Sequence, residues 1–286
     1  MDVVSLGYRT DLMLRRMAGA AVTDQGSYLA VRTPANPGFW WGNFLLHPEP
    51  PLPGDARRWA ERFAAEFPGA AHLAIGVDGT RGATGDPAEL ERLGVTVETL
   101  TVLTADRLAP PARPAPGAVL RPLAGDDDWA QAVELNLACA EGPTGPSAQA
   151  NHRLFAERRT AEARALCEAG HGAWFGAFAD GRLLAGAGLF GDGGGLARFQ
   201  NVETHPDVRR RGLATHLVHH AGGWGLGAFG ARATLVIVAD PDPDHHAIGV
   251  YRALGFADAE QQVQLTRPPA PAVSTEPAVS AASERP

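Results

Sequence analysis

Lysine is absent from this chain: all 25 basic residues among its 286 are arginine. The protein therefore has no lysine side chain of its own that could be acylated. Cysteine is nearly absent as well, with only Cys139 and Cys167 present. Two cysteines exclude a disulfide-dependent scaffold, and we expect both to be small, partly buried thiols on helices.

Long apolar runs are also missing. No run approaches the roughly 20 residues that a membrane-spanning helix needs, and the first residues show no basic segment followed by an apolar one. We therefore expect a cytoplasmic protein without a membrane span. The net charge of −7 argues against nucleic-acid binding, which requires a basic surface. An acidic surface tolerates cationic substrates, amines included.

Length and composition predict two globular domains. The chain is 45% hydrophobic and 20% charged, as is typical of soluble proteins. A segment rich in proline and alanine, LAPPARPAPG, reads as an extended linker. We expect an N-terminal domain over residues 1–109, a linker over 110–117 and a second domain over 118–267. The tail, 268–286, has almost no large apolar residues and is predicted to be disordered.

Alternation, apolar runs and turn residues predict the elements of both domains. In the first domain we expect strands at 12–17, 28–31, 71–77 and 95–103, and a turn that becomes a strand within 36–47, with helices at 56–67, capped by Asp55, and at 87–93. In the second we expect strands at 119–121, 173–179, 183–190, 199–204 and 234–239, helices at 129–139, 151–169 and 247–254, and a loop at 141–148.

The stretch FQNVETHPDVRRRGLATHL, residues 199–217, organises the second domain. Pro206 ends an extended run, because the residue before a proline is pushed out of the helical region. The run from Arg209 to Ala214 then opens a helix, whose apolar face is Leu213, Leu217, Ala221 and Trp224. Unpaired N–H groups and the helix dipole at such a start predict a phosphate or pyrophosphate site. The loop lacks the lysine of a P-loop and the three glycines of a dinucleotide fingerprint.

The spacing R-x-x-G-x-A over 209–214 resembles the pyrophosphate loop of the GNAT superfamily of acyl-CoA N-acyltransferases. The buried run TLVIVA over 234–239 and the pattern A-x-x-x-Y-x-x-x-G-F over 247–256 follow in that superfamily's order. The resemblance covers about residues 118–267. It implies an α+β (mixed α/β) fold, with a central mixed, splayed sheet flanked by helices.

The first domain repeats the element order of the second, so we expect two GNAT-like domains in tandem. The first copy is degenerate, because HPEPPLPGDARRW replaces the pyrophosphate loop and no tyrosine matches Tyr251. We therefore expect no coenzyme A there. An unrelated α+β domain of similar element order remains the alternative. Trp40, Trp41 and Asn43 could line a pocket in this domain, but we favour core packing for them.

By resemblance, the co-substrate is acetyl-CoA. Its pantetheine arm would pair with backbone groups of Val202 and Thr204, in the gap between two splayed strands. The pyrophosphate would bind at Arg209, Arg210, Arg211, Gly212, Leu213, Ala214 and Thr215. Asp244, where many relatives carry asparagine, and His245 would also contact the cofactor.

The resemblance implies that Tyr251 is the general acid that protonates the leaving thiolate. For the base that deprotonates the amine we favour Glu203 by its position; His205 and a chain of waters remain open. Backbone N–H groups of the splayed strand would polarise the acetyl carbonyl. The pairs His219-His220 and His245-His246 do not suggest a metal, because neighbouring helical residues point about 100° apart.

These features predict an acetyl-CoA-dependent N-acetyltransferase that acts by direct transfer in a ternary complex. The acceptor would be a primary amine of a small molecule or a peptide N-terminus. Two alternatives stay open: acetylation of an aminosugar thiol precursor, as in the tandem GNAT protein mycothiol synthase, and a CoA-binding sensor or interaction module without catalysis. The sequence leaves the choice between monomer and homodimer open.

Overall fold

The computed structural model describes residues 1–114, 117–140, 146–230, 232–242 and 246–269. Parts of the predicted linker and loop (115–116 and 141–145), Asp244 and His245 of the predicted cofactor site, and residues 270–286 of the tail lie outside the described residues. None of the helices within the described ranges is both long and apolar enough to cross a membrane.

The elements follow the predicted order closely. The N-terminal half contains α1 (Leu6–Met17), β1 (Ala21–Asp24), β2 (Leu29–Arg32), η1 (Trp40–Gly42), β3 (Phe44–His47), α2 (Asp55–Glu66), β4 (Leu73–Val77), α3 (Pro87–Arg92) and β5 (Thr96–Ala105). The C-terminal half contains β6 (Val119–Pro122), α4 (Gly125–Cys139), α5 (Pro146–Glu168), β7 (Gly172–Ala179), β8 (Arg182–Gly191), β9 (Leu196–Thr204), η2 (Pro206–Val208), α6 (Leu213–Ala228), β10 (Thr234–Ala239), α7 (Ala247–Ala253) and β11 (Ala257–Arg267).

The strand predicted at 12–17 is wrong, because these residues form the second half of α1. Leu12, Met13, Leu14 and Arg15 are all buried, so the run shows no polar face that would mark a helix. A second correction concerns α2. Its N-cap is Gly54, with φ of 88°, and the predicted cap Asp55 is the first helical residue.

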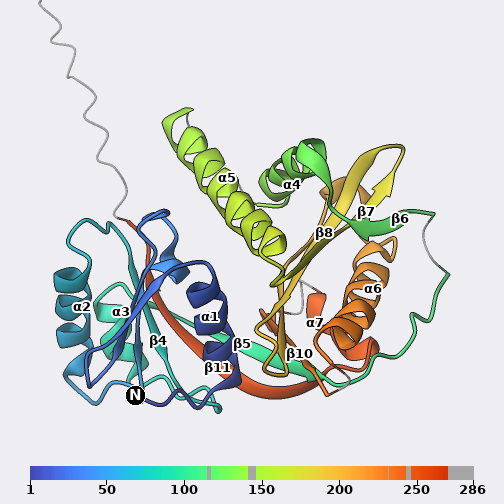
Figure 1. Ribbon diagram of the computed structural model, residues 1–286. Coiled ribbons are helices and arrows are strands. Elements are labelled where there is room, and N and C mark those ends of the chain that lie inside the picture. The colour runs from blue at the N-terminus through green and yellow to red at the C-terminus, as the bar shows by residue number, and fades with distance from the viewer. Residues whose placement is uncertain (115–116, 141–145, 231, 243–245, 270–286) are drawn as a thin grey trace, which may run out of the picture.

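All strands join one mixed sheet in the order β1-β2-β3-β4-β11-β5-β10-β9-β8-β7-β6. The halves exchange their long strands: β11, from the end of the chain, lies between β4 and β5, and β5 lies between β11 and β10. Figure 1 shows β5 and β11 crossing from one half to the other. The two halves are therefore joined by backbone pairing in the middle of the sheet.

An internal repeat is visible in the topology. The segments β3–α2–β4–α3–β5 and β9–α6–β10–α7–β11 each contain a parallel strand pair, a short helix and a long antiparallel strand. This arrangement confirms the predicted mixed sheet flanked by helices and the repeated element order of the two halves.

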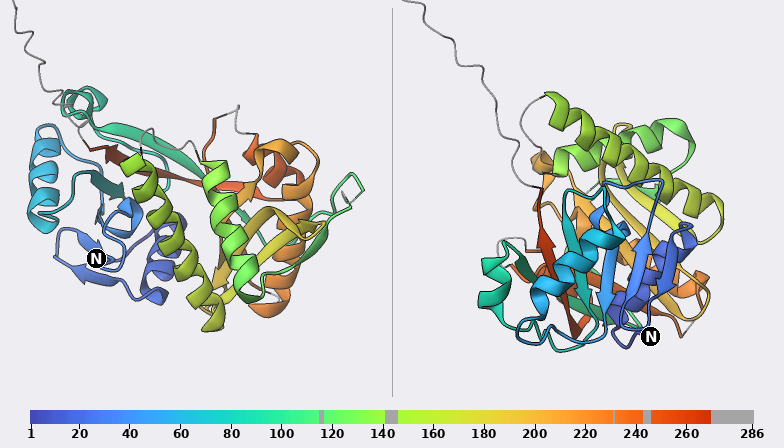
Figure 2. Two further views of the ribbon diagram at one scale, coloured as in Figure 1. Left: turned by 90° about the horizontal axis from the view of Figure 1, so that it is seen from above. Right: turned by 90° about the vertical axis from the view of Figure 1, so that its left-hand side faces the viewer.

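Helices cover both faces of the C-terminal part of the sheet. Trp174 of β7 contacts Trp129 of α4 with ring centroids 6.4 Å apart, whereas the next residue, Phe175, contacts Trp224 of α6 at 5.3 Å. Because neighbouring side chains of a strand point to opposite faces, α4 and α6 lie on opposite sides. Helix α5 packs beside α4 and lies between the two halves, as the views of Figures 1 and 2 show.

Candidate active site

The parallel strands β9 and β10 separate partway along their length. Their pairing runs from Thr234↔Leu196 to Val236↔Arg198 and then ends, although β9 continues to Thr204 and β10 to Ala239. The other edge of β10 stays paired with β5 as far as its last residue. One edge of the second half of β9 therefore faces a gap in the sheet, as the resemblance implies.

A bulge lies at the same place on β9. The register with β8 shifts between Gly186↔Glu203 and Gly188↔Gln200, and Asn201 has a positive φ of 44°. The extra residue disrupts the local ladder and bends the strand. The hydroxyl of Thr204 is buried and has no hydrogen-bond partner among the described residues. The end of β9 thus contains a buried hydroxyl that no described residue satisfies.

Glu203 and Val202 point to opposite faces of β9, as predicted from alternation. Val202 packs against the apolar cluster that includes Leu217 and Tyr251. Glu203 instead accepts a hydrogen bond of 2.5 Å from Nδ2 of Asn136 on α4. Burial raises the pKa of Glu203 to about 7, although the Asn136 hydrogen bond and the charge of Arg159 oppose the rise.

A cavity of about 20 Å³ lies against Glu203 and is also lined by Asn136, Arg159, Thr160 and Trp174. A volume of this size holds about one water molecule, and these side chains supply several polar partners for it. The Glu203 carboxyl group therefore lies beside a small polar space on the α4 and α5 side of the sheet.

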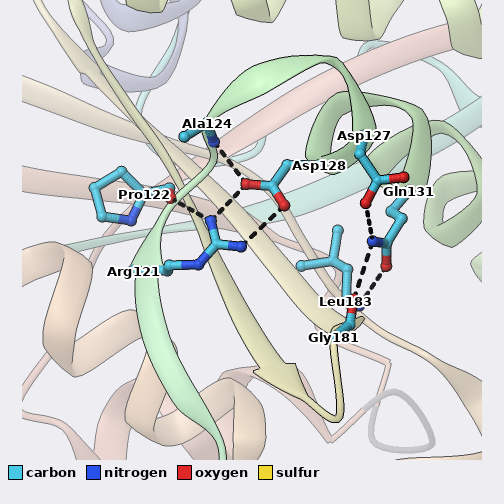
Figure 3. Close-up of polar contacts among 8 residues, drawn as sticks. All are labelled: Arg121, Pro122, Ala124, Asp127, Asp128, Gln131, Gly181 and Leu183. Atoms are coloured by element: carbon cyan, nitrogen blue, oxygen red, sulfur yellow. Dashed lines mark hydrogen bonds and ion pairs between the residues drawn. The ribbon is translucent and has the colours of Figure 1, made fainter.

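Polar contacts fix α4, which carries Asn136, to the sheet (Figure 3). Arg121 of β6 makes a bidentate ion pair with Asp128 at 2.5 and 2.9 Å, and Asp128 also accepts from the Ala124 N–H at 2.7 Å. The Gln131 side chain donates to the Gly181 carbonyl at 3.1 Å and accepts from the Leu183 N–H at 2.7 Å. These contacts hold the helix on β6 and on the β7–β8 turn.

Tyr251 lies on α7, on the face of the sheet opposite Glu203. It is 6% exposed, and its ring packs edge-on against Phe256 with centroids 6.2 Å apart. Burial alone raises its pKa to about 12. Within the described part of the chain its hydroxyl makes no hydrogen bond. A phenol with this pKa stays protonated at neutral pH and keeps its proton available.

The arginine-rich loop ends in a left-handed glycine. Gly212, with φ of 86°, is the N-cap of α6, so the helix begins at Leu213 rather than within the arginines as the sequence suggested. A short turn, η2, precedes the arginines. The first N–H groups of α6, which include those of Leu213, Ala214 and Thr215, have no intrahelical acceptor. The loop therefore presents donors at one point.

All three arginines of this loop are exposed. Arg209 donates to the Thr204 carbonyl at 3.2 Å and Arg211 to the Asp207 carbonyl at 3.3 Å, whereas Arg210 has a positive φ of 66°. These bonds hold two of the side chains close to the end of β9. The structure thus brings the predicted pyrophosphate loop beside the strand end that borders the gap.

His205, the other candidate base, belongs to the η2 turn. Its Nδ1 accepts a hydrogen bond of 3.4 Å from the Asp207 N–H. Its own backbone N–H donates to the Leu184 carbonyl at 2.9 Å. The structure therefore gives His205 a local capping contact, whereas Glu203 faces the cavity.

Sequence reasoning missed three neighbours of this site. Asn136 and Cys139 lie three positions apart and so share one face of α4, a signal that the sequence contained. Cys139 donates through its thiol to the Thr204 carbonyl at 3.3 Å. Arg159 lies on α5, and nothing local in the sequence marks it, because its partners come from distant segments.

The N-terminal half has no corresponding gap. Its parallel pair, β3 and β4, stays in register to the last residues, His47↔Val77, and the Asp78 N–H extends the ladder by donating to the His47 carbonyl at 2.7 Å. Trp40 stacks on His72 at 5.2 Å and Trp41 meets Phe44 edge-on at 5.4 Å. Both tryptophans are partly buried and pack against the core cluster of this half, which agrees with the packing role that we favoured from the sequence.

No group of three or more His, Cys, Asp or Glu side chains that could hold a metal ion occurs within the described ranges. That statement does not extend to His245.

Comparison with known proteins agrees with this geometry. The acetyltransferase (GNAT) family pattern matches residues 132–256. A GCN5-related N-acetyltransferase from Kribbella flavida is similar in structure, with a TM-score of 0.62, 18% identity and coverage of 93% of this chain and 96% of that one. A functionally unknown conserved protein from Staphylococcus epidermidis gives 0.64 with 10% identity, covering 87% and 93%.

A putative acetyltransferase of the GNAT family from Novosphingobium aromaticivorans has a TM-score of 0.52 and 21% identity, and covers 87% of this chain and 92% of that one. At these identities the solved structures establish the fold alone. No curated protein matches the sequence significantly.

Proposed function

Because residues 132–256 match the acetyltransferase (GNAT) family, we propose that this chain transfers an acetyl group from acetyl-CoA to a primary amine. The observation that carries the proposal is the gap between β9 and β10, which lies beside the arginine loop and the N-terminus of α6. Bound acetyl-CoA supplies the acetyl group as an activated thioester. The protein supplies orientation, proton transfer and charge stabilisation.

The residues of the gap fit this co-substrate. Val202 and Thr204 lie on a strand edge that β10 leaves unpaired, and their backbone groups are the ones proposed to bind the pantetheine arm. The proposed pyrophosphate site comprises Arg209, Arg210, Arg211, Gly212, Leu213, Ala214 and Thr215, where helix N–H groups and arginine charge act on the same anion. Asp244 and His245 stay in the proposed cofactor site, although they lie outside the described residues.

Glu203 acts as the general base in this proposal. An alkylammonium has a pKa near 10.4 and must lose a proton before its nitrogen can attack a thioester. A carboxylate with a pKa of about 7 is partly ionised at neutral pH and accepts that proton better than an ordinary glutamate would. The cavity beside Glu203 has room for about one water molecule to relay the proton.

Tyr251 acts as the general acid that protonates the thiolate leaving group. Its burial keeps the phenol neutral, so the proton is present when charge develops on sulfur. The backbone N–H groups around the bulge at Asn201 are candidates for stabilising the oxyanion of the tetrahedral intermediate. The base and the acid lie on opposite faces of β9. The amine therefore loses its proton on one face, and the thiolate gains a proton on the other.

The N-terminal half serves as a scaffold in this proposal rather than as a second transferase. Its strands β3 and β4 remain paired to their ends, so a pantetheine arm finds no open strand edge between them. The acceptor is a small molecule with a primary amine or a peptide N-terminus. Nothing in the described residues favours an aminosugar thiol precursor over other amines.

Thermal unfolding with and without acetyl-CoA tests the proposal. A ligand at 100 times its dissociation constant stabilises the native state by about 2.7 kcal/mol. We expect a clear shift for the natural protein and none for Gly212→Asp, because the new carboxylate repels the pyrophosphate. Gly193→Asp is the matched control: Gly193 also has a positive φ, of 75°, but lies with open space around it at the other end of β9.

Loss of the shift in both variants would show a general effect of an added aspartate and would count against the loop. An acetylation panel of polyamines, peptides and aminosugars then addresses the acceptor. Acetyl-CoA binding without acetylation of any amine would replace the enzyme with a CoA-binding sensor.

A further inference from the structure

Helix α5 connects the base to the N-terminal half. Its residue Arg159 lines the same small cavity as Glu203. The Arg159 side chain is 15% exposed and donates to Oε1 of Glu162, on the same helix, at 2.5 Å. In Figure 1, α5 lies above the boundary between the halves, with α1 on one side and α4 on the other.

Two residues of the N-terminal half hold this arginine from the other side. The Arg159 guanidinium lies 4.1 Å from the ring centroid of Phe39, over the ring. The guanidinium of Arg15, from α1, lies 4.9 Å from the same ring. Arg15 also binds Glu162 through two hydrogen bonds of 3.1 and 2.9 Å. Phe39 and Glu162 are thus shared by both arginines.

The charges of this cluster balance only when Glu203 is included. Arg15 and Arg159 carry two positive charges, and Glu162 carries one negative charge. One positive charge remains, and it faces the cavity beside Glu203. The other elements packed around Glu203 offer Asn136 and the Cys139 thiol from α4 and Gly186 from β8. Within the described residues, Arg159 is therefore the cation that favours ionised Glu203.

We propose that Arg159 is a positioning residue for the base, and that the N-terminal half contributes to catalysis by holding it: Phe39 and Arg15, through Glu162, fix the Arg159 guanidinium opposite Glu203. The inference rests on the proposed function, since it assigns the base role to Glu203. The N-terminal half, whose parallel strands leave no gap for a cofactor, would thereby take part in the chemistry.

A purely structural role for the cluster makes a different prediction. If the contacts only join the halves, breaking them lowers the unfolding temperature but leaves the ionisation of Glu203 unchanged. Buried ion pairs contribute little net stability in many proteins, so their presence alone does not decide between the two roles.

The test measures the pH profile of kcat/KM for the acceptor in Arg159→Gln, Arg159→Lys and Phe39→Leu. Removing a facing charge raises the pKa of a carboxyl group, so we expect the acidic limb of Arg159→Gln to move up by about one unit. Activity below that limb then falls about tenfold, while KM for acetyl-CoA stays the same. Arg159→Lys keeps the positive charge, so its acidic limb stays close to the natural one, and Phe39→Leu gives a smaller shift than Arg159→Gln in the same direction.

Matched controls exist for both kinds of variant. Arg153→Gln removes another ion pair of α5, to Glu134 on α4, away from the cavity. Phe67→Leu removes another aromatic ring that lies under a guanidinium: that of Arg32 is 5.3 Å from the centroid of the Phe67 ring. We expect both controls to keep the natural pH profile. An unchanged profile in Arg159→Gln would overturn the inference.

A second readout does not need activity. The pKa of Glu203 also follows from the pH dependence of the unfolding free energy, compared with and without Glu203→Gln. We expect Arg159→Gln to enlarge this dependence and Arg153→Gln to leave it alone. If the natural protein acetylates no amine, the proposed function fails, yet this measurement still decides: an unchanged dependence would refute the positioning of Glu203 by Arg159.

Discussion

Replacing Glu203 by glutamine should stabilise the protein at alkaline pH while it disables the proposed base. Burial raises the pKa of Glu203 from its usual 4.5 to about 7. Between these values the folded state holds a proton that the unfolded state releases, so stability falls as pH rises through this window. Glutamine does not titrate, and the variant escapes that loss.

The size of the effect follows from the shift. One pKa unit corresponds to 1.36 kcal/mol, so the full shift amounts to about 3 kcal/mol at pH 8 and to little at pH 5. The amide keeps an oxygen that accepts from Asn136, so the hydrogen bond at 2.5 Å has a replacement. With typical unfolding entropies for a chain of this length, the gain at pH 8 corresponds to about 5 °C in Tm.

The assay is urea unfolding of the natural protein and Glu203→Gln at pH 5 and pH 8, with acetylation measured alongside. Glu134→Gln is the control, because Glu134 is exposed on α4, the helix that carries Asn136, and the hydrogen bond from Arg153 lowers its pKa. We expect a stabilised, inactive Glu203→Gln at pH 8 and no gain in the control. Equal stability changes at both pH values would refute the assigned environment of Glu203.

Three further predictions follow from other sites. Tyr251→Phe should lower kcat while acetyl-CoA binding, measured by calorimetry, persists; unchanged turnover would remove Tyr251 from the acid role. The same calorimetry should give one acetyl-CoA per chain, because of the two parallel strand pairs in the described residues β9 and β10 separate whereas β3 and β4 do not, and a stoichiometry of two would contradict the scaffold role of the N-terminal half. Burial lowers the pKa of His47 from 6.5 to about 3, so the neutral form is favoured in the fold and stability is lost as pH falls below 6.5. His47→Phe should therefore remove about 2 kcal/mol of acid sensitivity between pH 7 and pH 5, measured by urea unfolding, and an unchanged pH dependence would exclude His47 as its source.

Much of the fold could be predicted because its signals are local. Gly212 and the arginines before it mark a helix start within a few residues, and TLVIVA marks a buried strand without reference to any partner. The tyrosine of α7 is recognised from its own short segment. The error at residues 12–17 has the converse reason: the four consecutive residues Leu12 to Arg15 are all buried, because α1 packs against several strands of the sheet, and such a short run resembles a buried strand.

Three features depend on tertiary structure. The exchange of β5 and β11 pairs strands that lie far apart in the chain, such as Thr99 with Val263, and no local pattern encodes such a partner. The bulge at Asn201 exists only against β8. Around Glu203, the sequence by itself determined a carboxyl group at the end of a strand. Its raised pKa, its hydrogen bond to Asn136 and its facing cation Arg159 arise only when α4, α5 and the N-terminal half pack together and exclude water.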